Sequence, residues 1–272
     1  LITNALSKKM FLKLIAIKLI PLLSIIIGSI LVLKALWNII SLRKIEWKEF
    51  KSLDLNLLDM VLLISGGFVV LGEVISPLFS ITLVDLIASN LSIELIQSLK
   101  IFFGYLFMAF PPLLIIYYQI KSVDKHSIFK KDYFQFNIYP IKDSISQGFK
   151  GCLMIMPFVL LVSLVMNLLV DNQNGSNPLL EIVLNSNNYF SFILLFLTTT
   201  ILAPIFEEII FRGVLLPILS REFGIILGIT ISAFIFALAH LSISEMIPLF
   251  TLGIGLGTTR LISGRLSSSV IM

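Results

Sequence analysis

Long apolar runs separated by short polar segments dominate this chain of 272 residues. Seven runs approach or exceed the roughly 20 residues that a helix needs to cross a bilayer core about 30 Å thick. They lie near residues 19–40, 57–80, 101–119, 151–170, 188–206, 225–240 and 246–262. The pattern predicts an all-α polytopic membrane bundle, with about seven to eight transmembrane helices in the parent protein.

Composition supports this prediction. Hydrophobic residues make up 57% of the chain and charged residues only 13%, about half of the share that is usual in soluble domains. The lysines ahead of the first run resemble the start of a signal peptide, but the run is too long and no small-residue cleavage site follows. We therefore expect a multi-pass integral membrane protein whose first run is a helix or anchor.

Basic residues are unevenly distributed among the polar segments, and Lys and Arg in short loops mark the cytoplasmic side of a membrane protein. The loop 120–150 and the stretch 41–56 are basic, whereas the loops near 84–97 and 171–187 contain no Lys or Arg. The two basic segments are therefore expected at the cytoplasmic face and the other two at the opposite face. Lysines on both sides of the first helix leave its orientation open. The basic excess needs no nucleic-acid partner, and the lipid bilayer is the partner that the composition implies.

Three segments follow from these patterns. Residues 1–56 hold the first helix and the basic cytoplasmic stretch, residues 57–184 hold further membrane helices, and residues 185–272 hold the candidate chemistry. Glu73 lies inside an apolar run with no partner by spacing, and we interpret it as a structural hydrogen-bonding group. It is also the one feature that favours a transporter, because transporters use polar sites at membrane depth.

The segment APIFEEIIFRGVLLP, residues 203–217, places two carboxylates and an arginine after a long apolar run. An ionisable group within the bilayer costs several kcal/mol unless it faces the bundle or water, so it is a candidate for function. Glu208 and Arg212 lie one helical turn apart and are expected to form an ion pair. Glu207 points elsewhere, which leaves it available for proton transfer. The alternative is that all three residues are solvated at the cytoplasmic membrane edge.

The segment FALAH, residues 236–240, ends in one of only two histidines, and the other, His126, is interpreted as a solvated loop residue. A turn around PILSREFG, residues 217–224, would fold the two helices antiparallel. With helix ends near Leu219 and Ile225, the rise of 1.5 Å per residue puts Glu207 about 18 Å and His240 about 22 Å from the turn. A lone histidine at a helix end is more often bonded to a carbonyl, but a facing carboxylate makes His240 a catalytic candidate.

A carboxylate and an imidazole that face each other in a membrane cavity either activate water for attack on a carbonyl or ligate a metal with further donors. If the reaction uses a metal, Glu207 and His240 are the expected ligands, and a divalent ion such as zinc is the expected cofactor. Two glutamates and one histidine are too few to define a zinc site, and the sequence contains no HExxH motif.

EEIIFR fits the pattern Glu-Glu-xxx-Arg and FALAH fits Phe-xxx-His. In order and spacing the two motifs resemble those of the CPBP family, the type II CAAX prenyl proteases and bacteriocin-processing enzymes that are also called the Abi family. The resemblance covers about residues 185–272. It implies that Glu207 activates the water and that His240 helps to activate it or binds a metal. Glu208 and Arg212 would be the supporting pair, and Phe236 would pack beside the histidine.

The family also has a third motif, a histidine followed four residues later by asparagine, which would stabilise an oxyanion. The stretch that precedes this motif in the family corresponds to GRLSSSVIM, residues 264–272, so the histidine would follow Met272. The resemblance therefore implies either a fragment of an active protease or an inactive relative, and this exact chain is expected to be a poor protease. Whether such proteins work as glutamate proteases or metalloproteases stays open.

The sequence thus predicts an intramembrane endopeptidase, a hydrolase that cleaves a membrane-associated peptide or protein near the cytoplasmic leaflet. The alternative is a non-catalytic membrane scaffold, or a bacteriocin self-immunity protein, on the same fold. Replacing Glu207 with Gln separates the two, because an enzyme loses function with its fold intact whereas a scaffold keeps it.

Overall fold

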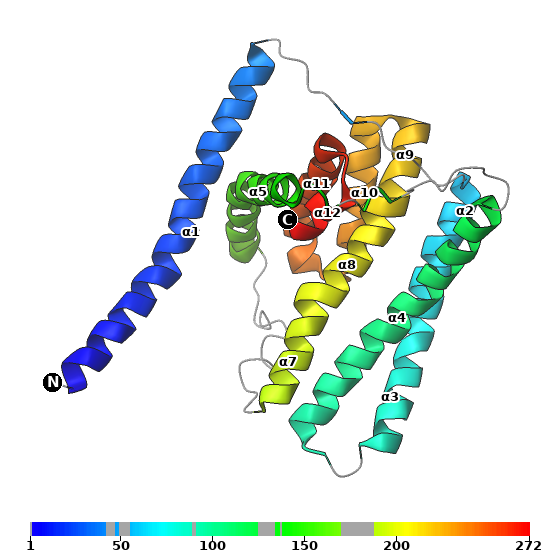
Figure 1. Cartoon of the computed structure of the whole chain (residues 1–272), viewed down its shortest axis with the longest axis horizontal. Coiled ribbons are helices and arrows are strands. Elements are labelled where there is room, and N and C mark those ends of the chain that lie inside the picture. Colours follow the sequence, from blue (N-terminus) through cyan, green and yellow to red (C-terminus); the bar gives the residue numbers. More distant parts are fainter. Residues whose placement is uncertain are drawn as a thin grey trace. The chain divides into compact units, whose positions relative to one another are not determined.

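The computed structural model describes residues 2–41, 47–48, 55–88, 91–124, 134–136, 138–169 and 188–272, without the side chains of residues 2–18 and 122–124. All regular elements in these residues are helices (Figure 1). Six are long and apolar enough to cross a membrane: Leu19–Ile40, Leu57–Ile87, Ile93–Lys121, Ile141–Leu169, Tyr189–Phe223 and Ile243–Ser263. The expected all-α polytopic bundle is confirmed, and the protein is an integral multi-pass membrane protein.

The apolar run near residues 225–240 forms a helix at the predicted place. Helix α10, Ile225–Ala239, has 15 residues. At a rise of 1.5 Å per residue it is about 22 Å long, which is less than the roughly 30 Å of the hydrocarbon core. By length, α10 therefore differs from the six full spans.

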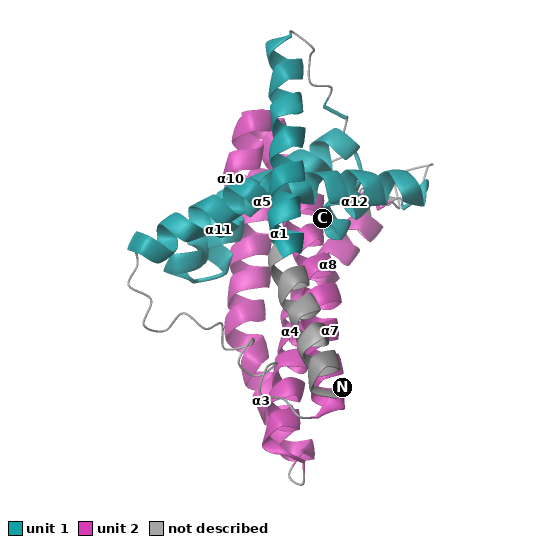
Figure 2. Cartoon of the chain, turned by 90° about the vertical axis from the view of Figure 1, so that its left-hand side faces the viewer, with its two compact units in different colours: residues 1–49, 137–171, 233–272 teal, residues 50–136, 172–232 magenta. Residues whose placement is uncertain are grey.

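The chain divides into two compact units, which Figure 2 shows in different colours. Unit 1 combines Leu1–Glu49, Asn137–Asp171 and Ala233–Met272, and unit 2 combines Phe50–Phe136 and Asn172–Ser232. Each unit joins segments that are far apart in the chain, whereas the three segments expected from the sequence follow chain order. The boundary at residues 232 and 233 falls inside α10.

Unit 2 contains two long interrupted spans and a long uninterrupted α-helix. The first span consists of α2 (Leu57–Leu62), η1 (Leu63–Ile75) and α3 (Ser76–Ile87), and α4 (Ile93–Asp124) returns alongside it. The second span consists of α7 (Tyr189–Leu197), η2 (Thr198–Leu202), α8 (Ala203–Glu208), η3 (Ile209–Leu215) and α9 (Leu216–Phe223). Asn56 and Asn188 cap the two spans, because their side chains accept hydrogen bonds from the amides of Asp59 and Phe190.

The interruptions η1, η2 and η3 are π-helical, and each is followed by a helix with a proline in its first turn, Pro77, Pro204 or Pro217. A proline has no N–H and its ring clashes with the carbonyl four residues earlier, so an ordinary α-helical turn cannot close there. The amides of Ser76, Ala203 and Leu216 instead donate to carbonyls five residues earlier. Such wide turns are rare and often lie at functional sites.

The turn between α9 and α10 lies where the sequence predicts it, but the first helix is longer than expected. It continues past Leu219 to Phe223 and ends at Gly224, whose φ of 83° favours glycine. Arg221 and Glu222 form the exposed last turn of this helix. A Cβ added to Gly228 would lie 2.7 Å from Ser220 Cα, and Ser232 Oγ donates to the Phe211 carbonyl at 3.1 Å. These contacts fix the antiparallel arrangement of the two helices within unit 2.

Unit 1 contains α1 (Ile2–Ile40), α5 (Ile141–Leu169), the end of α10, α11 (Ile243–Ser263) and α12 (Leu266–Ile271). Small residues lie where these helices approach closely. A Cβ at Gly253 would lie 3.0 Å from Ala233 Cα, and one at Gly255 would lie 3.0 Å from Ile155 Cβ. Such small residues promote helix packing where lipid supplies no hydrophobic drive.

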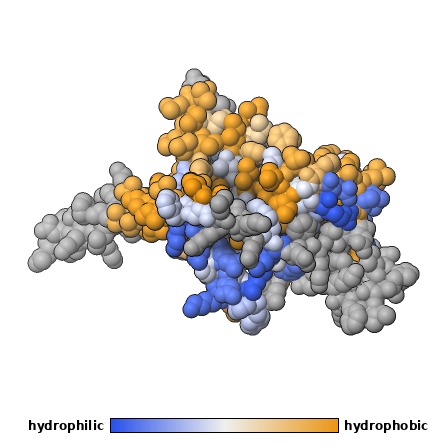
Figure 3. All heavy atoms as spheres, turned by 90° about the horizontal axis from the view of Figure 1, so that it is seen from above, coloured by the Kyte–Doolittle hydropathy of each residue, from blue (hydrophilic) through white to orange (hydrophobic). Residues whose placement is uncertain are grey.

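The basic loop expected at 120–150 is shorter in the structure. Helix α4 continues to Asp124 and α5 begins at Ile141, so Lys142 and Lys150 are helical residues. A charged first turn beyond the apolar run is hard to distinguish from a loop by composition alone. Many large apolar side chains on the helices are exposed, and Figure 3 shows hydrophobic side chains over much of the visible face. In a membrane protein these side chains face lipid.

Candidate functional site

Glu208 and Arg212 form the ion pair that their spacing predicts. Arg212 Nη1 lies 2.8 Å from Glu208 Oε1, and the two side chains are only 1% and 4% exposed, respectively. Glu208 ends α8, and Arg212 lies in the π-helical stretch η3. The alternative that this pair is solvated at the membrane edge is therefore wrong. A charge pair this deep needs both partners, because either one alone would be a buried uncompensated charge.

Glu207 differs from its neighbour in both burial and surroundings. Its side chain is half-buried, and its electrostatic neighbours within unit 2 are Arg212, Glu208 and a third carboxylate, Glu73. Tyr105 in α4 interacts electrostatically with both Glu207 and Glu73. Unit 2 therefore gathers ionisable groups from three separate spans around Glu207.

The packing of η1 explains how Glu73 reaches this cluster. The Phe68 ring lies 5.8 Å from the Phe206 ring and 6.0 Å from the Phe211 ring, so η1 packs against α8 and η3. On the α4 side, a Cβ at Gly72 would lie 3.1 Å from the Met108 carbonyl oxygen, and Ser76 Oγ donates to the Phe107 carbonyl. Glu73 directly follows Gly72. It therefore lies in η1, the element that packs against α8 and η3 on one side and against α4 on the other.

Sequence reasoning missed Glu73 and Tyr105 as members of this cluster. The interpretation of Glu73 as a carboxylate without a partner considered only its own helix, whereas its electrostatic neighbours come from other helices. The available signal was that Glu73 and Glu207 are both acids inside apolar runs. An acid at membrane depth is expected to face other polar groups, so two of them are expected to share one site.

His240 lies directly after α10, in unit 1. Its Nδ1 is 2.8 Å from the Phe236 carbonyl oxygen. A carbonyl oxygen only accepts hydrogen bonds, so Nδ1 carries the hydrogen and Nε2 of the neutral ring keeps its lone pair. Phe236 is buried, and its ring meets the imidazole edge-on at a centroid distance of 4.7 Å. The Phe236 carbonyl and the Phe236 ring together orient the imidazole of His240. The hydrogen bond to the backbone uses Nδ1, not Nε2.

Residues 189–272 match the family model described as type II CAAX prenyl endopeptidase Rce1-like. This region is Rce1-like. The match confirms, for this part of the chain, the resemblance that the two motifs indicate. The whole chain matches no curated protein and no solved structure.

The Rce1-like region covers α7 to α12 and contains both motifs. Glu207, Glu208 and Arg212 belong to unit 2, whereas Phe236 and His240 belong to unit 1. The structure brings the first three together and the last two together. Along the chain, Glu207 and His240 lie at nearly equal separations from Gly224, and their approach to one another stays a prediction.

Residues 264–272, which the resemblance matches to the stretch before the third family motif, end the matched region. Gly264 ends α11 with a φ of 69°, and α12 follows at Leu266–Ile271. The side chains of Ser267, Ser268 and Ser269 are buried, and Ser267 Oγ lies 3.2 Å from Ser144 Oγ of α5. Residues 264–272 are therefore largely helical and packed within unit 1.

A protein-bound metal ion needs several donor side chains close together. Within the described ranges, which leave out His126, no group of three or more His, Cys, Asp or Glu side chains is arranged to hold a metal ion. A catalytic zinc ion normally takes three protein ligands. The ligand pair expected from the sequence consists of Glu207 and His240, which is one ligand fewer than such a zinc site needs. The reaction steps proposed for this protein therefore involve no metal ion.

Proposed function

We propose that this protein is an intramembrane endopeptidase that hydrolyses a peptide bond of a membrane-associated substrate from the cytoplasmic side. The match of residues 189–272 to a family of endopeptidases supports the reaction class. The observation that carries the assignment of residues is the division of roles between adjacent glutamates. Glu208 is held by Arg212 in a buried pair, whereas Glu207 is half-buried and also interacts electrostatically with Glu73 and Tyr105.

Glu207 and His240 would act together on water. A water molecule attacks the carbonyl carbon while Glu207 accepts one of its protons, and a tetrahedral intermediate forms. The C–N bond then breaks, and the proton passes to the leaving nitrogen. His240 fits the role of a second base or hydrogen-bond acceptor, because its Nδ1–H bond to Phe236 leaves Nε2 with its lone pair.

Access from the cytoplasmic side is supported by the end of the second span. Arg221 Nη2 donates to the Leu55 carbonyl at 2.7 Å. Leu55 belongs to the basic stretch 41–56, which the positive-inside rule assigns to the cytoplasm. The turn between α9 and α10 is thereby proposed to lie at the cytoplasmic end of unit 2.

The substrate class is a membrane-associated peptide or protein. The description of the matched family names a prenylated CAAX sequence. For this chain we propose only that the scissile bond lies beside a lipid-embedded segment, because Glu207 lies within a membrane span. A prenyl group is one way to hold a peptide there, and a hydrophobic peptide segment is another.

The test uses the full chain in liposomes with a peptide library in which half of the peptides carry a farnesylated cysteine, and mass spectrometry identifies the cleavage products. We expect Glu207→Gln to lower the cleavage rate by about 10²–10⁴-fold, the usual contribution of a general base. Glu222→Gln is the matched control, because Glu222 lies in the same span and is exposed. The control should cleave at the wild-type rate, and all proteins should unfold at the same temperature.

Equal cleavage by wild type and Glu207→Gln would overturn the catalytic assignment. If the wild-type chain cleaves no peptide of the library while a cellular function survives in Glu207→Gln, the protein acts as a non-catalytic membrane scaffold.

A further inference from the structure

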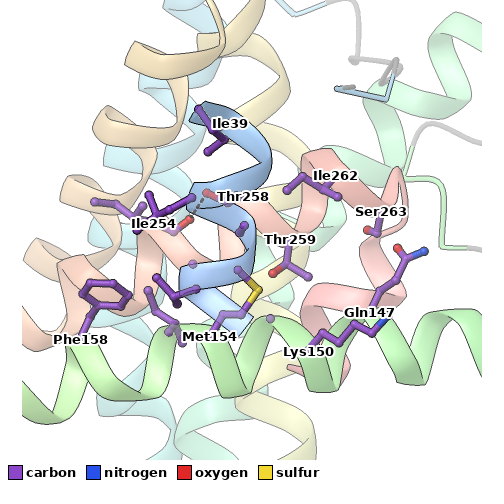
Figure 4. A pocket seen from close by; sticks show the side chains of 16 residues that line it. Ile39, Gln147, Lys150, Met154, Phe158, Ile254, Thr258, Thr259, Ile262 and Ser263 are labelled. Atoms are coloured by element: carbon purple, nitrogen blue, oxygen red, sulfur yellow. Dashed lines mark hydrogen bonds between the residues drawn. The ribbon is translucent and has the colours of Figure 1, made fainter. Parts of the chain in front are cut away.

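A cavity lies entirely within unit 1, between α1, α5 and α11 (Figure 4). Its volume is about 400 Å³, within the range of roughly 300–1,000 Å³ that is typical of small-molecule sites. None of its lining residues is a candidate catalytic residue. The proposed protease reaction therefore leaves this cavity unexplained.

The two ends of the cavity differ in chemistry. In Figure 4 the labelled side chains of Gln147, Lys150 and Ser263 lie at one end, whereas Phe158 and Ile254 lie at the other. Val32 of α1 also belongs to the apolar part of the lining. The cavity therefore matches a ligand with a polar head and a hydrocarbon tail.

The polar end of the cavity contains side chains that can bind a charged ligand. Lys150 is exposed and takes part in none of the ion pairs found among the described residues. Gln147 has a buried Oε1 without a hydrogen-bond partner in the described part of the chain. A buried polar atom without a partner is unusual in a native protein and points to a missing ligand or water. A lysine that has no acidic partner adds charge complementarity to an anion.

The polar end also lies at a specific end of the helices. Gln147 and Lys150 belong to the amino-terminal part of α5, which follows the basic loop, and Ser263 is the last residue of α11. By the positive-inside rule this end faces the cytoplasm. The cytoplasmic leaflet is the one that carries anionic phospholipids in many membranes.

We propose that this cavity binds one acyl chain of an anionic phospholipid from the cytoplasmic leaflet. The Lys150 ammonium group would hold the phosphate, Gln147 Oε1 would accept a hydrogen bond from a donor of the headgroup, and the acyl chain would extend toward Phe158 and Ile254. The bound lipid would contact α1, α5 and α11 together and so fasten the first helix to the rest of unit 1.

The experiment is native mass spectrometry of the purified, delipidated full chain with phosphatidylglycerol or phosphatidylcholine of the same acyl chains. The wild-type protein should bind phosphatidylglycerol more tightly. Lys150→Gln should weaken that binding about fivefold, as expected for the loss of one lysine near an anionic headgroup, and leave phosphatidylcholine binding unchanged. Lys142→Gln is the matched control, since Lys142 is an exposed lysine of the same helix outside the cavity lining.

A second variant tests the hydrocarbon part of the site. Ala35 of α1 lines the cavity, so Ala35→Trp should fill it and abolish binding of both lipids. Circular dichroism would establish that the variant is folded, and the Lys150 comparison stands without it. Equal effects of Lys150→Gln and Lys142→Gln, or wild-type binding by a folded Ala35→Trp, would overturn the proposal.

Discussion

The Arg212 guanidinium group lies 2.8 Å from the Glu208 carboxylate, with at most 4% of either side chain exposed. The pair sits in a membrane span, where both charges have lost their water. Arg212 contacts one glutamate of the EEIIFR motif directly, whereas the other, Glu207, is half-buried and also interacts electrostatically with Glu73 and Tyr105. The two adjacent carboxylates therefore lie in different environments.

The first prediction concerns the stability of this pair. Arg212→Met and Glu208→Gln should each lower the free energy of unfolding by about 3–5 kcal/mol, because each leaves the other partner as an uncompensated buried group. The double variant should lose less than the sum of the two. Denaturant unfolding in detergent, followed by tryptophan fluorescence, measures all three.

A surface pair provides the control. Lys100 Nζ lies 2.7 Å from Asp85 Oδ1, but the side chains are 31% and 55% exposed. Lys100→Gln should cost less than about 1 kcal/mol, the usual value for an exposed pair. If Arg212→Met proves as mild as Lys100→Gln, the buried pair does not stabilise the span.

The second prediction concerns the approach of η1 to α4. Gly72→Ala would place a Cβ 3.1 Å from the Met108 carbonyl oxygen, which belongs to a helix backbone and cannot easily move. The substitution should lower stability by about 1–3 kcal/mol, the usual cost of overpacking, and displace Glu73 from the cluster. Thermal unfolding and the peptide cleavage assay measure the two effects.

Gly66→Ala is the matched variant for Gly72→Ala. Gly66 lies in the same π-helical stretch, and an added Cβ would meet no atom within 4 Å. This substitution should be neutral or stabilise by up to about 1 kcal/mol, because it reduces the freedom of the unfolded chain. Equal stability of the two variants would show that η1 and α4 do not pack as closely as described.

The third prediction concerns the ring contact between Phe236 and His240, and it rests on the proposed protease activity. Phe236→Leu removes the edge-on contact at 4.7 Å but keeps the main-chain carbonyl that accepts from Nδ1. A looser imidazole should lower kcat about tenfold with KM unchanged, the pattern of an interaction used in the transition state. His240→Ala should lower kcat further. A fall in stability with kcat preserved would assign Phe236 a packing role only.

The fourth prediction tests membrane orientation by labelling with a membrane-impermeant maleimide. The native Cys152 is first replaced by Ala, and single cysteines are then introduced as Glu222→Cys and Leu91→Cys. Glu222 lies in the last turn of α9, and Leu91 lies between α3 and α4. The positive-inside rule predicts labelling of position 222 from the cytoplasmic side and of position 91 from the opposite side. Labelling of both positions from one side would contradict the assigned orientation.

The periodicity and length of the apolar runs were sufficient to predict most helices of this protein. The Glu208–Arg212 pair also followed from spacing alone, because both residues belong to one helix turn. The π-helical stretches did not follow, although Pro77, Pro204 and Pro217 were visible in the sequence. A proline in a membrane helix allows several local responses, and tertiary packing decides among a kink, a break and a wide turn.

Relationships between distant segments were the main part that the sequence did not reveal. Glu73 has no partner on its own helix, and its place beside Glu207 and Tyr105 depends on how η1 packs against two other spans. Lys150 was expected in a loop, but it lies on α5 and lines a cavity formed with α1 and α11. Both cases depend on contacts between residues separated by more than a hundred positions.

The hydrogen bond from His240 to the Phe236 carbonyl has a genetic consequence. Every amino acid supplies the same main-chain carbonyl, so no substitution at position 236 removes the acceptor itself. The tautomer of the imidazole is thereby protected against point mutation at its own partner and depends only on the helical path of residues 236–240. A substitution at position 236 therefore changes the ring contact with the imidazole but not the carbonyl that accepts from Nδ1.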